Sequence, residues 1–175
     1  MELFDRMNKI KAFVFDVDGV MTDSLIHLSE NGDQTRTMNV RDGFALRRAV
    51  DSGYVVGVIT GGRSEGVVLR LKGLGIEDIY SGVTLKHLAF DEFKSKNQLS
   101  DQEIMYMGDD LIDIPVMKKA GLAAAPQDAV TEVLQIAQYV SNYQGGRGCV
   151  RDIIEKVMKL HGTWPEFHEG EHLGV

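Results

Sequence analysis

Residues 10–20 read IKAFVFDVDGV, a mostly apolar run that ends in two aspartates and a glycine. The segment from Ile10 to Phe15 has the length and composition of a buried strand. Asp16 and Asp18 follow where this strand gives way to a turn at Gly19. The sequence therefore predicts two carboxylates at the carboxyl end of a central strand.

The rest of the chain alternates short apolar runs with longer amphipathic stretches. This alternation is typical of β-α units around a mostly parallel sheet. Further strands are predicted at residues 55–59, 79–81, 104–107, 122–125 and 139–140. Helices are predicted at about 42–52, 64–74, 84–97, 110–120, 129–137 and 149–160. We expect an α/β, doubly wound fold.

One segment departs from the alternation. Residues 24–40 read as two strands about Asn31-Gly32, a pair that favours a tight hairpin. Residues 161–175 contain Gly, Pro, Glu and His without periodicity, as is typical of a mobile or partner-docked tail. We expect one domain over residues 1–160, carrying a projecting hairpin and followed by the tail.

Length, charge and cysteine usage narrow the class of protein. The 175 residues fit one domain. The net charge is −7 and the basic residues are scattered, which argues against a nucleic-acid partner. The single Cys149 has no partner for an intrachain disulfide, and no apolar run is long enough for a signal peptide or a membrane span. We expect a cytoplasmic protein without a membrane partner.

Polar residues collect where the predicted strands end. In an open α/β sheet, ligands bind beyond the carboxyl ends of the strands. Besides Asp16 and Asp18, these places hold the segments 60–63 (TGGR) and 108–110 (GDD), together with Lys86 and with Asp113 one helical turn after the second segment. They form the candidate active site.

Asp16 is the candidate nucleophile, since a carboxylate can attack a phosphoryl group and form an aspartyl phosphate. Attack of one anion on another needs charge cancellation, and Mg²⁺ bound by hard oxygen ligands supplies it. We expect Asp16, Asp109 and the backbone carbonyl of Asp18 as its protein ligands. Lys86 and the Thr60 hydroxyl would stabilise the phosphoryl oxygens.

The other acidic residues are expected to have different roles. Asp18 is the candidate general acid and base: it would protonate the leaving alkoxide and then activate water. Asp110 and Asp113 lie in the first turn of a predicted helix, where negative charge is favoured. They are expected to orient the waters of the metal and Lys86.

These motifs, D-x-D-G-V, Thr-Gly, a lone Lys and G-D-D-x-x-D in this order, resemble the haloacid dehalogenase superfamily of phosphatases. The resemblance covers roughly residues 10–160 and implies a Rossmann-like fold. Larger members carry a cap domain, but here only the short hairpin fits the first insertion position, and only residues 82–85 precede Lys86. The resemblance is therefore to the capless branch.

Within that branch, three segments resemble the 3-deoxy-D-manno-octulosonate (KDO) 8-phosphate phosphatases: residues 39–43 (NVRDG), Gly82-Val83 and residues 145–148 (GGRG). Those enzymes act in lipopolysaccharide precursor synthesis and are tetramers whose hairpins associate. The resemblance implies a homo-oligomer, with a phosphorylated sugar acid contacted by Asp18, Asn39, Val40, Arg41, Asp42, Gly43, Arg47, Gly61, Arg63, Arg70 and Lys86. Arginines suit such a substrate because they bind carboxylates bidentately.

One departure from the pattern and three alternative functions stand beside this interpretation. Relatives often read Thr-Gly-Arg or Ser-Gly-Arg, whereas here Gly62 moves the arginine to position 63. Nine-carbon sugar-acid 9-phosphates are the second candidate substrates. A phospho-accepting receiver domain also places Asp, Thr and Lys at strand ends, but it needs no proton shuttle such as Asp18. A catalytically silent binding module is disfavoured by the complete set of polar residues.

Overall fold

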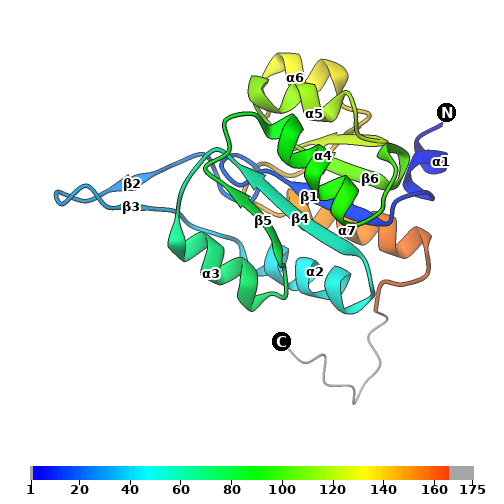
Figure 1. Ribbon diagram of the computed structural model, residues 1–175, viewed down its shortest axis with the longest axis horizontal. Helices are drawn as coiled ribbons and strands as arrows, with labels where there is room; N and C mark the ends of the chain where they lie inside the picture. The colour runs from blue at the N-terminus through cyan, green and yellow to red at the C-terminus, as the bar shows by residue number, and fades with distance from the viewer. Residues whose placement is uncertain (1, 166–175) are drawn as a thin grey trace.

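The computed structural model describes residues 2–165, which contain a six-stranded sheet between two layers of helices (Figure 1). In chain order its elements are α1 (Leu3–Met7), β1 (Ala12–Phe15), β2 (His27–Leu28), β3 (Gln34–Thr35), α2 (Val40–Asp51), β4 (Val55–Thr60), α3 (Glu65–Gly73), β5 (Asp78–Ser81), α4 (Lys86–Lys96), η1 (Asp101–Glu103), β6 (Ile104–Met107), η2 (Leu111–Asp113), α5 (Ile114–Met117), β7 (Leu122–Ala125), α6 (Thr131–Ile136), β8 (Tyr139–Val140) and α7 (Cys149–Leu160).

The sheet has the order β5-β4-β1-β6-β7-β8, and every neighbouring pair is parallel. β1 lies near the centre, with Ala12 in register with Val55 on one side and Ile104 on the other. The predicted α/β, doubly wound fold is confirmed. The predicted bounds of β6, β7, β8 and α7 match the structure residue for residue.

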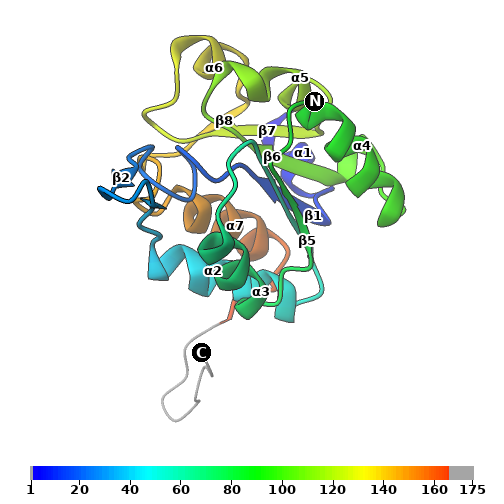
Figure 2. The ribbon, with the colours of Figure 1, turned by 60° about the vertical axis from the view of Figure 1, so that its left-hand side comes forward.

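The alternating side chains of β1 show how the two layers are held. Phe13 and Phe15 pack on the face covered by α2, α3 and α7, whereas Ala12 and Val14 pack on the face covered by α4, α5 and α6. Figure 2 shows these two sets of helices on opposite sides of the sheet. Because both faces are buried, the central strands are apolar throughout.

The helix predicted over residues 110–120 is wrong in detail. The structure has the short 3-10 helix η2 followed by the one-turn helix α5. Asp110 and Asp113 form a reciprocal capping box around η2, and Pro115 lies in the first turn of α5. These local hydrogen bonds favour two short helices, η2 and then α5, over one continuous helix. α1, which the sequence analysis did not predict, buries Met7.

The predicted hairpin is confirmed, but its strands are shorter than residues 24–40 suggested. β2 and β3 pair antiparallel over two residues each. The N–H of Ser29 donates to the carbonyl of Asp33 at 3.0 Å, which closes a tip containing Asn31-Gly32. The hairpin projects from the body beside the carboxyl edge of the sheet (Figure 1). Val40, predicted as its last residue, instead begins α2.

The first residues of the predicted tail pack on the body. His161 Nδ1 lies 2.6 Å from the hydroxyl of Tyr54, and Trp164 packs against the core. The folded part therefore extends beyond residue 160, while residues 166–175 of the predicted tail lie outside the described residues. Within residues 2–165, no helix has both the length and the apolar character needed to cross a membrane.

Candidate active site

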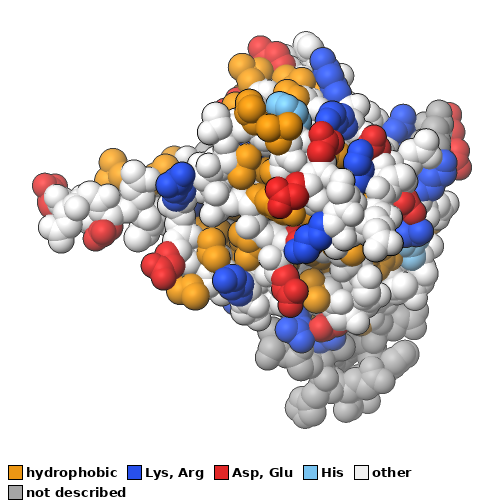
Figure 3. All heavy atoms as spheres, viewed as in Figure 1, with side chains coloured by type: hydrophobic (Ala, Val, Ile, Leu, Met, Phe, Trp, Pro, Cys, Tyr) orange, Lys and Arg blue, Asp and Glu red, His pale blue; other side chains and the backbone are white. Residues whose placement is uncertain are grey.

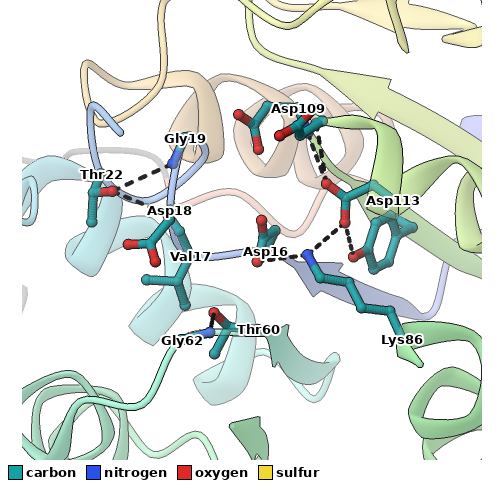
Figure 4. A network of polar contacts seen from close by, with 12 residues as sticks. Asp16, Val17, Asp18, Gly19, Thr22, Thr60, Gly62, Lys86, Asp109 and Asp113 are labelled. Atoms are coloured by element: carbon teal, nitrogen blue, oxygen red, sulfur yellow. Dashed lines mark hydrogen bonds and ion pairs between the residues drawn. The ribbon is translucent and has the colours of Figure 1, made fainter. Parts of the chain in front are cut away.

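The carboxyl edge of the sheet brings five of the predicted residues together (Figure 4). Asp16 follows β1, Thr60 ends β4 and Lys86 starts α4 after β5, while Asp109 and Asp113 follow β6. Asp16 is only 4% exposed, and its N–H donates to the carbonyl of Met107 at 3.0 Å. Parallel strands thus place side chains from three other segments around the buried carboxylate of Asp16.

Lys86 is the cation at the centre of this cluster. Its Nζ lies 2.9 Å from Asp16 Oδ1 and 2.7 Å from Asp113 Oδ1. Burial alone would lower the pKa of Lys86, but the two carboxylates outweigh burial and raise it. Lys86 therefore stays charged in the site.

Asp113 holds the cluster together, because both of its carboxylate oxygens accept hydrogen bonds from neighbouring groups. Its Oδ1 accepts from Lys86 and from the hydroxyl of Tyr106 at 2.6 Å. Its Oδ2 accepts from the N–H groups of Asp109 and Asp110 at 3.2 and 3.3 Å. The contact with Lys86 suits the predicted role of Asp113 in orienting that lysine, while its role towards the waters of the metal stays a prediction. Asp110 acts locally, since its Oδ1 accepts from the N–H of Leu111. Tyr106 was missed because its strand reads as uniformly buried.

The carboxylates of Asp16, Asp109 and Asp113 offer oxygens within 4.8 Å of one another. Burial first, and then a neighbouring carboxylate, raise the pKa of Asp16 to about 7 and that of Asp109 to about 8. Asp109 Oδ1 is buried without a hydrogen-bond partner. A divalent cation would offset the repulsion among these carboxylates and would give the unpaired Asp109 oxygen a partner. Because the oxygens of Asp113 are already engaged, Asp16 and Asp109 are the side chains that fit Mg²⁺.

Gly19 explains why a glycine follows the second aspartate. Its φ of +96° lies in the left-handed region, and a Cβ there would lie 1.9 Å from Asp109 Oδ2. The turn after β1 therefore approaches the loop after β6 more closely than any residue with a side chain would allow.

Asp18 lies on the opposite side of Asp16 from Lys86 (Figure 4). Its carboxylate is held by Arg36, whose Nε lies 2.6 Å from Oδ1 and whose Nη2 lies 3.1 Å from Oδ2. Arg36 follows β3 at the base of the hairpin. The sequence analysis missed it because a single arginine in a predicted exposed strand carries no periodic or motif signal.

The segment 39–43, predicted to contact substrate, mostly has structural partners. Asn39 caps α2 and also donates from Nδ2 to the carbonyl of Gly146 at 3.2 Å. Asp42 is buried and accepts from the N–H of Arg151 at 2.8 Å, near the start of α7, and burial raises its pKa to about 6. Gly43 is also buried, whereas Val40 and Arg41 are exposed. Asp42 is thus engaged with the start of α7 in this structure, and its direct contact with substrate stays a prediction.

The remaining predicted arginines lie apart. Arg47 sits towards the end of α2 and pairs with Asp51 at 2.9 Å, and its contact with substrate stays a prediction. Arg63 and Gly61 are exposed in the loop after β4. Arg70 on α3 is exposed and lines a groove of about 470 Å³ together with Arg36 and Ser64.

Comparison with known proteins reveals extensive similarity. Residues 72–153 match the haloacid dehalogenase-like hydrolase family. The chain is 37% identical to the KDO 8-phosphate phosphatase KdsC of Escherichia coli K12 over 165 residues, which cover 94% of this chain and 88% of the relative. The chain belongs to the haloacid dehalogenase-like hydrolases. The predicted superfamily is thereby confirmed.

Two solved structures of this family support the assignment. KDO 8-phosphate phosphatase from Yersinia pestis superposes with a TM-score of 0.90 at 37% identity, covering 92% of this chain and 87% of that one. The enzyme from Moraxella catarrhalis, solved in complex with magnesium ion, phosphate ion and KDO, gives 0.87 at 30% identity and covers 90% of each chain. The relatives are phosphatases, and one holds the metal that the acidic cluster of this hydrolase fits.

Proposed function

We propose that this hydrolase is a Mg²⁺-dependent phosphatase that converts KDO 8-phosphate to KDO and phosphate. The observation that carries the proposal is the cluster of Asp16, Lys86 and Asp109 at the carboxyl edge of the sheet. The 37% identity to a KDO 8-phosphate phosphatase over nearly the whole chain supports the substrate. The nine-carbon sugar-acid 9-phosphates are the alternative on the same scaffold.

In the first step, a carboxylate oxygen of Asp16 attacks phosphorus and the bond from phosphorus to the sugar oxygen breaks, which leaves an aspartyl phosphate. Mg²⁺ held by Asp16 and Asp109 would neutralise the phosphoryl charge. Lys86, fixed by Asp113, and the Thr60 hydroxyl would donate to the phosphoryl oxygens. The Thr60 oxygen is oriented by the N–H of Gly62, which donates to it at 3.1 Å.

Asp18 serves both steps. Its proton passes to the departing sugar oxygen, and its carboxylate then takes a proton from a water whose oxygen attacks phosphorus. The bond between phosphorus and Asp16 breaks, phosphate leaves and both aspartates return to their starting forms. A receiver domain would lack this second step and retain its phosphate.

A phosphate-release screen tests the proposal. Wild-type protein at fixed Mg²⁺ should release phosphate fastest from KDO 8-phosphate, more slowly from nine-carbon sugar-acid 9-phosphates, and slowest from a neutral hexose 6-phosphate. A preference for a nine-carbon acid would replace the substrate but keep the reaction. Stable phosphorylation without phosphate release would favour the receiver function, and no reaction with any ester would leave a binding module.

Magnesium should raise the melting temperature, and more so at high pH. The raised pKa values of Asp16 and Asp109 mean that the metal-free fold is stabilised while these groups hold protons, and that this stabilisation is lost as pH rises through about 7 to 8. Mg²⁺ must displace those protons, so its effect should be larger at roughly pH 8.5 than at pH 6. Thermal unfolding with and without Mg²⁺ measures this.

The variant Asp109→Asn is the control for the magnesium experiment, and Mg²⁺ should raise its melting temperature much less than that of wild type. An equal shift of the melting temperature at both pH values would contradict the assigned ligands.

Ca²⁺ should restore activity poorly after chelation because its larger, irregular shell does not align nucleophile and phosphate.

We also propose that the protein is a homo-oligomer, a tetramer by analogy with the family. Apolar side chains on the hairpin remain exposed, with Leu25 at 61%, Ile26 at 44% and Leu28 at 73%. Figure 3 shows the hairpin standing clear of the body, with hydrophobic side chains along it. A two-stranded ribbon cannot bury these residues alone, and isolated hairpins are marginal in water. Met38, in contrast, packs against the core of its own chain.

Sedimentation of the double variant Leu25→Glu/Leu28→Glu tests the assembly. Wild type should sediment as an oligomer at micromolar concentration, whereas the variant should dissociate and lose activity. Phe4→Glu, at a residue 67% exposed on α1, is the matched control and should leave the assembly intact. A fully active wild-type monomer would exclude the proposed assembly.

The cytoplasmic location of the protein stays a prediction.

A further inference from the structure

Arg36 is the side chain through which the hairpin reaches the active site. The hairpin residues Gln34 and Thr35 are exposed, but the Arg36 side chain is only 5% exposed. Its two hydrogen bonds to Asp18 are side-on, with Nε and Nη2 each serving one carboxylate oxygen. Such bidentate pairs fix the plane of the carboxylate as well as its position.

The loop after β4 and the start of α3 lie against the pair of Arg36 and Asp18. A Cβ on Gly62 would lie 3.0 Å from Asp18 Oδ2 and 3.3 Å from Arg36 Nη2, so the loop after β4 packs directly on the two side chains. Arg36 and Asp18 also line a small cavity with Ser64 and Val67 at the start of α3. A side chain at position 62 would press on the pair, which would have to shift by a few tenths of an ångström.

The burial of the guanidinium decides its role. Nη1 is buried without a hydrogen-bond partner, so it is not open to an incoming substrate anion. The charge of Arg36 is instead compensated by Asp18, whose side chain is 33% exposed. Because Arg36 pairs with Asp18, the candidate acid, a role of Arg36 in the reaction would act through Asp18.

We propose that Arg36 is a positioning residue that holds Asp18 in the orientation from which its proton reaches the departing sugar oxygen. This inference rests on the proposed phosphatase reaction. Asp18 must take up a proton before this step, so one of its two oxygens then keeps the hydrogen bond from Arg36 while the other carries the proton. That proton moves to the sugar oxygen as the bond between phosphorus and that oxygen breaks, and Arg36 itself gains and loses nothing. Through this pair, the hairpin is part of the catalytic apparatus.

The test compares two leaving groups. A sugar alkoxide needs a proton to depart, whereas p-nitrophenolate needs almost none. The ratio kcat/KM covers the steps up to the first irreversible one, formation of the aspartyl phosphate, so later hydrolysis does not mask the difference. We would measure kcat/KM for the best alkyl phosphate of the screen and for p-nitrophenyl phosphate in Arg36→Met and Arg36→Lys.

Arg36→Met should lower kcat/KM for the alkyl phosphate by about 10–100-fold and for the aryl phosphate by less than about 3-fold. Arg36→Lys should recover a large part of the loss, since an ammonium can still donate to one oxygen of Asp18. Arg151→Met is the control: Arg151 pairs with Glu155 on α7 at 3.0 Å, and its loss should affect both substrates equally.

Three outcomes would overturn the inference. Equal losses on both substrates would indicate a general structural role. A faster alkyl reaction in Arg36→Met would mean that the pair restrains Asp18, and unchanged rates would mean that the pair is idle. Sedimentation and melting temperature of each variant identify losses caused by dissociation or unfolding. If wild type hydrolyses neither ester, the proposed function fails first, and that result is separate from these.

Discussion

Asp16→Asn should lower turnover of the sugar phosphate by roughly 10⁴-fold or more, because an amide cannot attack phosphorus. The substitution is nearly isosteric, and the buried side chain remains within reach of Lys86. We therefore expect the variant to fold, which melting temperature and circular dichroism would verify. Steady-state phosphate release with a detection limit well below wild type measures the loss.

Asp78→Asn is the matched control for this prediction. Asp78 is also a buried carboxylate paired with a lysine, Lys96, but it begins β5 at the amino edge of the sheet. Its neutralisation should leave turnover within a few-fold of wild type. Near-normal activity of Asp16→Asn would remove the nucleophile from the mechanism, and a comparable loss in both variants would attribute the effect to stability.

The convergence of Asp16, Thr60, Lys86 and Asp109 could be predicted because it depends on strand ends alone. Each residue terminates an apolar run or follows one closely, and parallel strands in one sheet share their carboxyl edge. The strands themselves could be predicted because helices cover both faces of the sheet, so that each strand is a short continuous apolar run. No knowledge of side-chain packing was needed for this part of the site.

The contacts of Arg36 and Asp42 could not be predicted from the sequence. The position of Arg36 depends on how the hairpin folds back on the turn after β1, a contact across 18 residues that leaves no periodic trace. Asp42 looked like a substrate ligand, yet the packing of α2 against α7 gives it the N–H of Arg151 as a partner. Both outcomes follow from tertiary contacts, which local patterns do not encode.

Substitution of Lys86 should have the largest effect on stability. Lys86→Met keeps the length of the side chain but leaves Asp16 and Asp113 buried without their cation. Removing one partner of a buried ion pair costs about 3–5 kcal/mol. Urea unfolding in the absence of Mg²⁺ should show a loss of this size near neutral pH. Turnover should fall by about 10²–10³-fold, since a donor to the phosphoryl oxygens is gone.

The burial of the ion pair, rather than its N–O distance, should set the loss of stability in Lys86→Met. A second, exposed ion pair of similar distance in the same chain tests this. Lys119 Nζ lies 2.7 Å from Asp91 Oδ2, as close as Lys86 to Asp113, but those side chains are 40% and 41% exposed. Lys119→Met should therefore cost less than about 1 kcal/mol. The loss in Lys86→Met should also shrink in acid, because the raised pKa of Asp16, about 7, allows that carboxyl group to become neutral there. Equal losses in the two variants, or a loss independent of pH, would show that the buried carboxylates do not depend on Lys86 for their charge compensation.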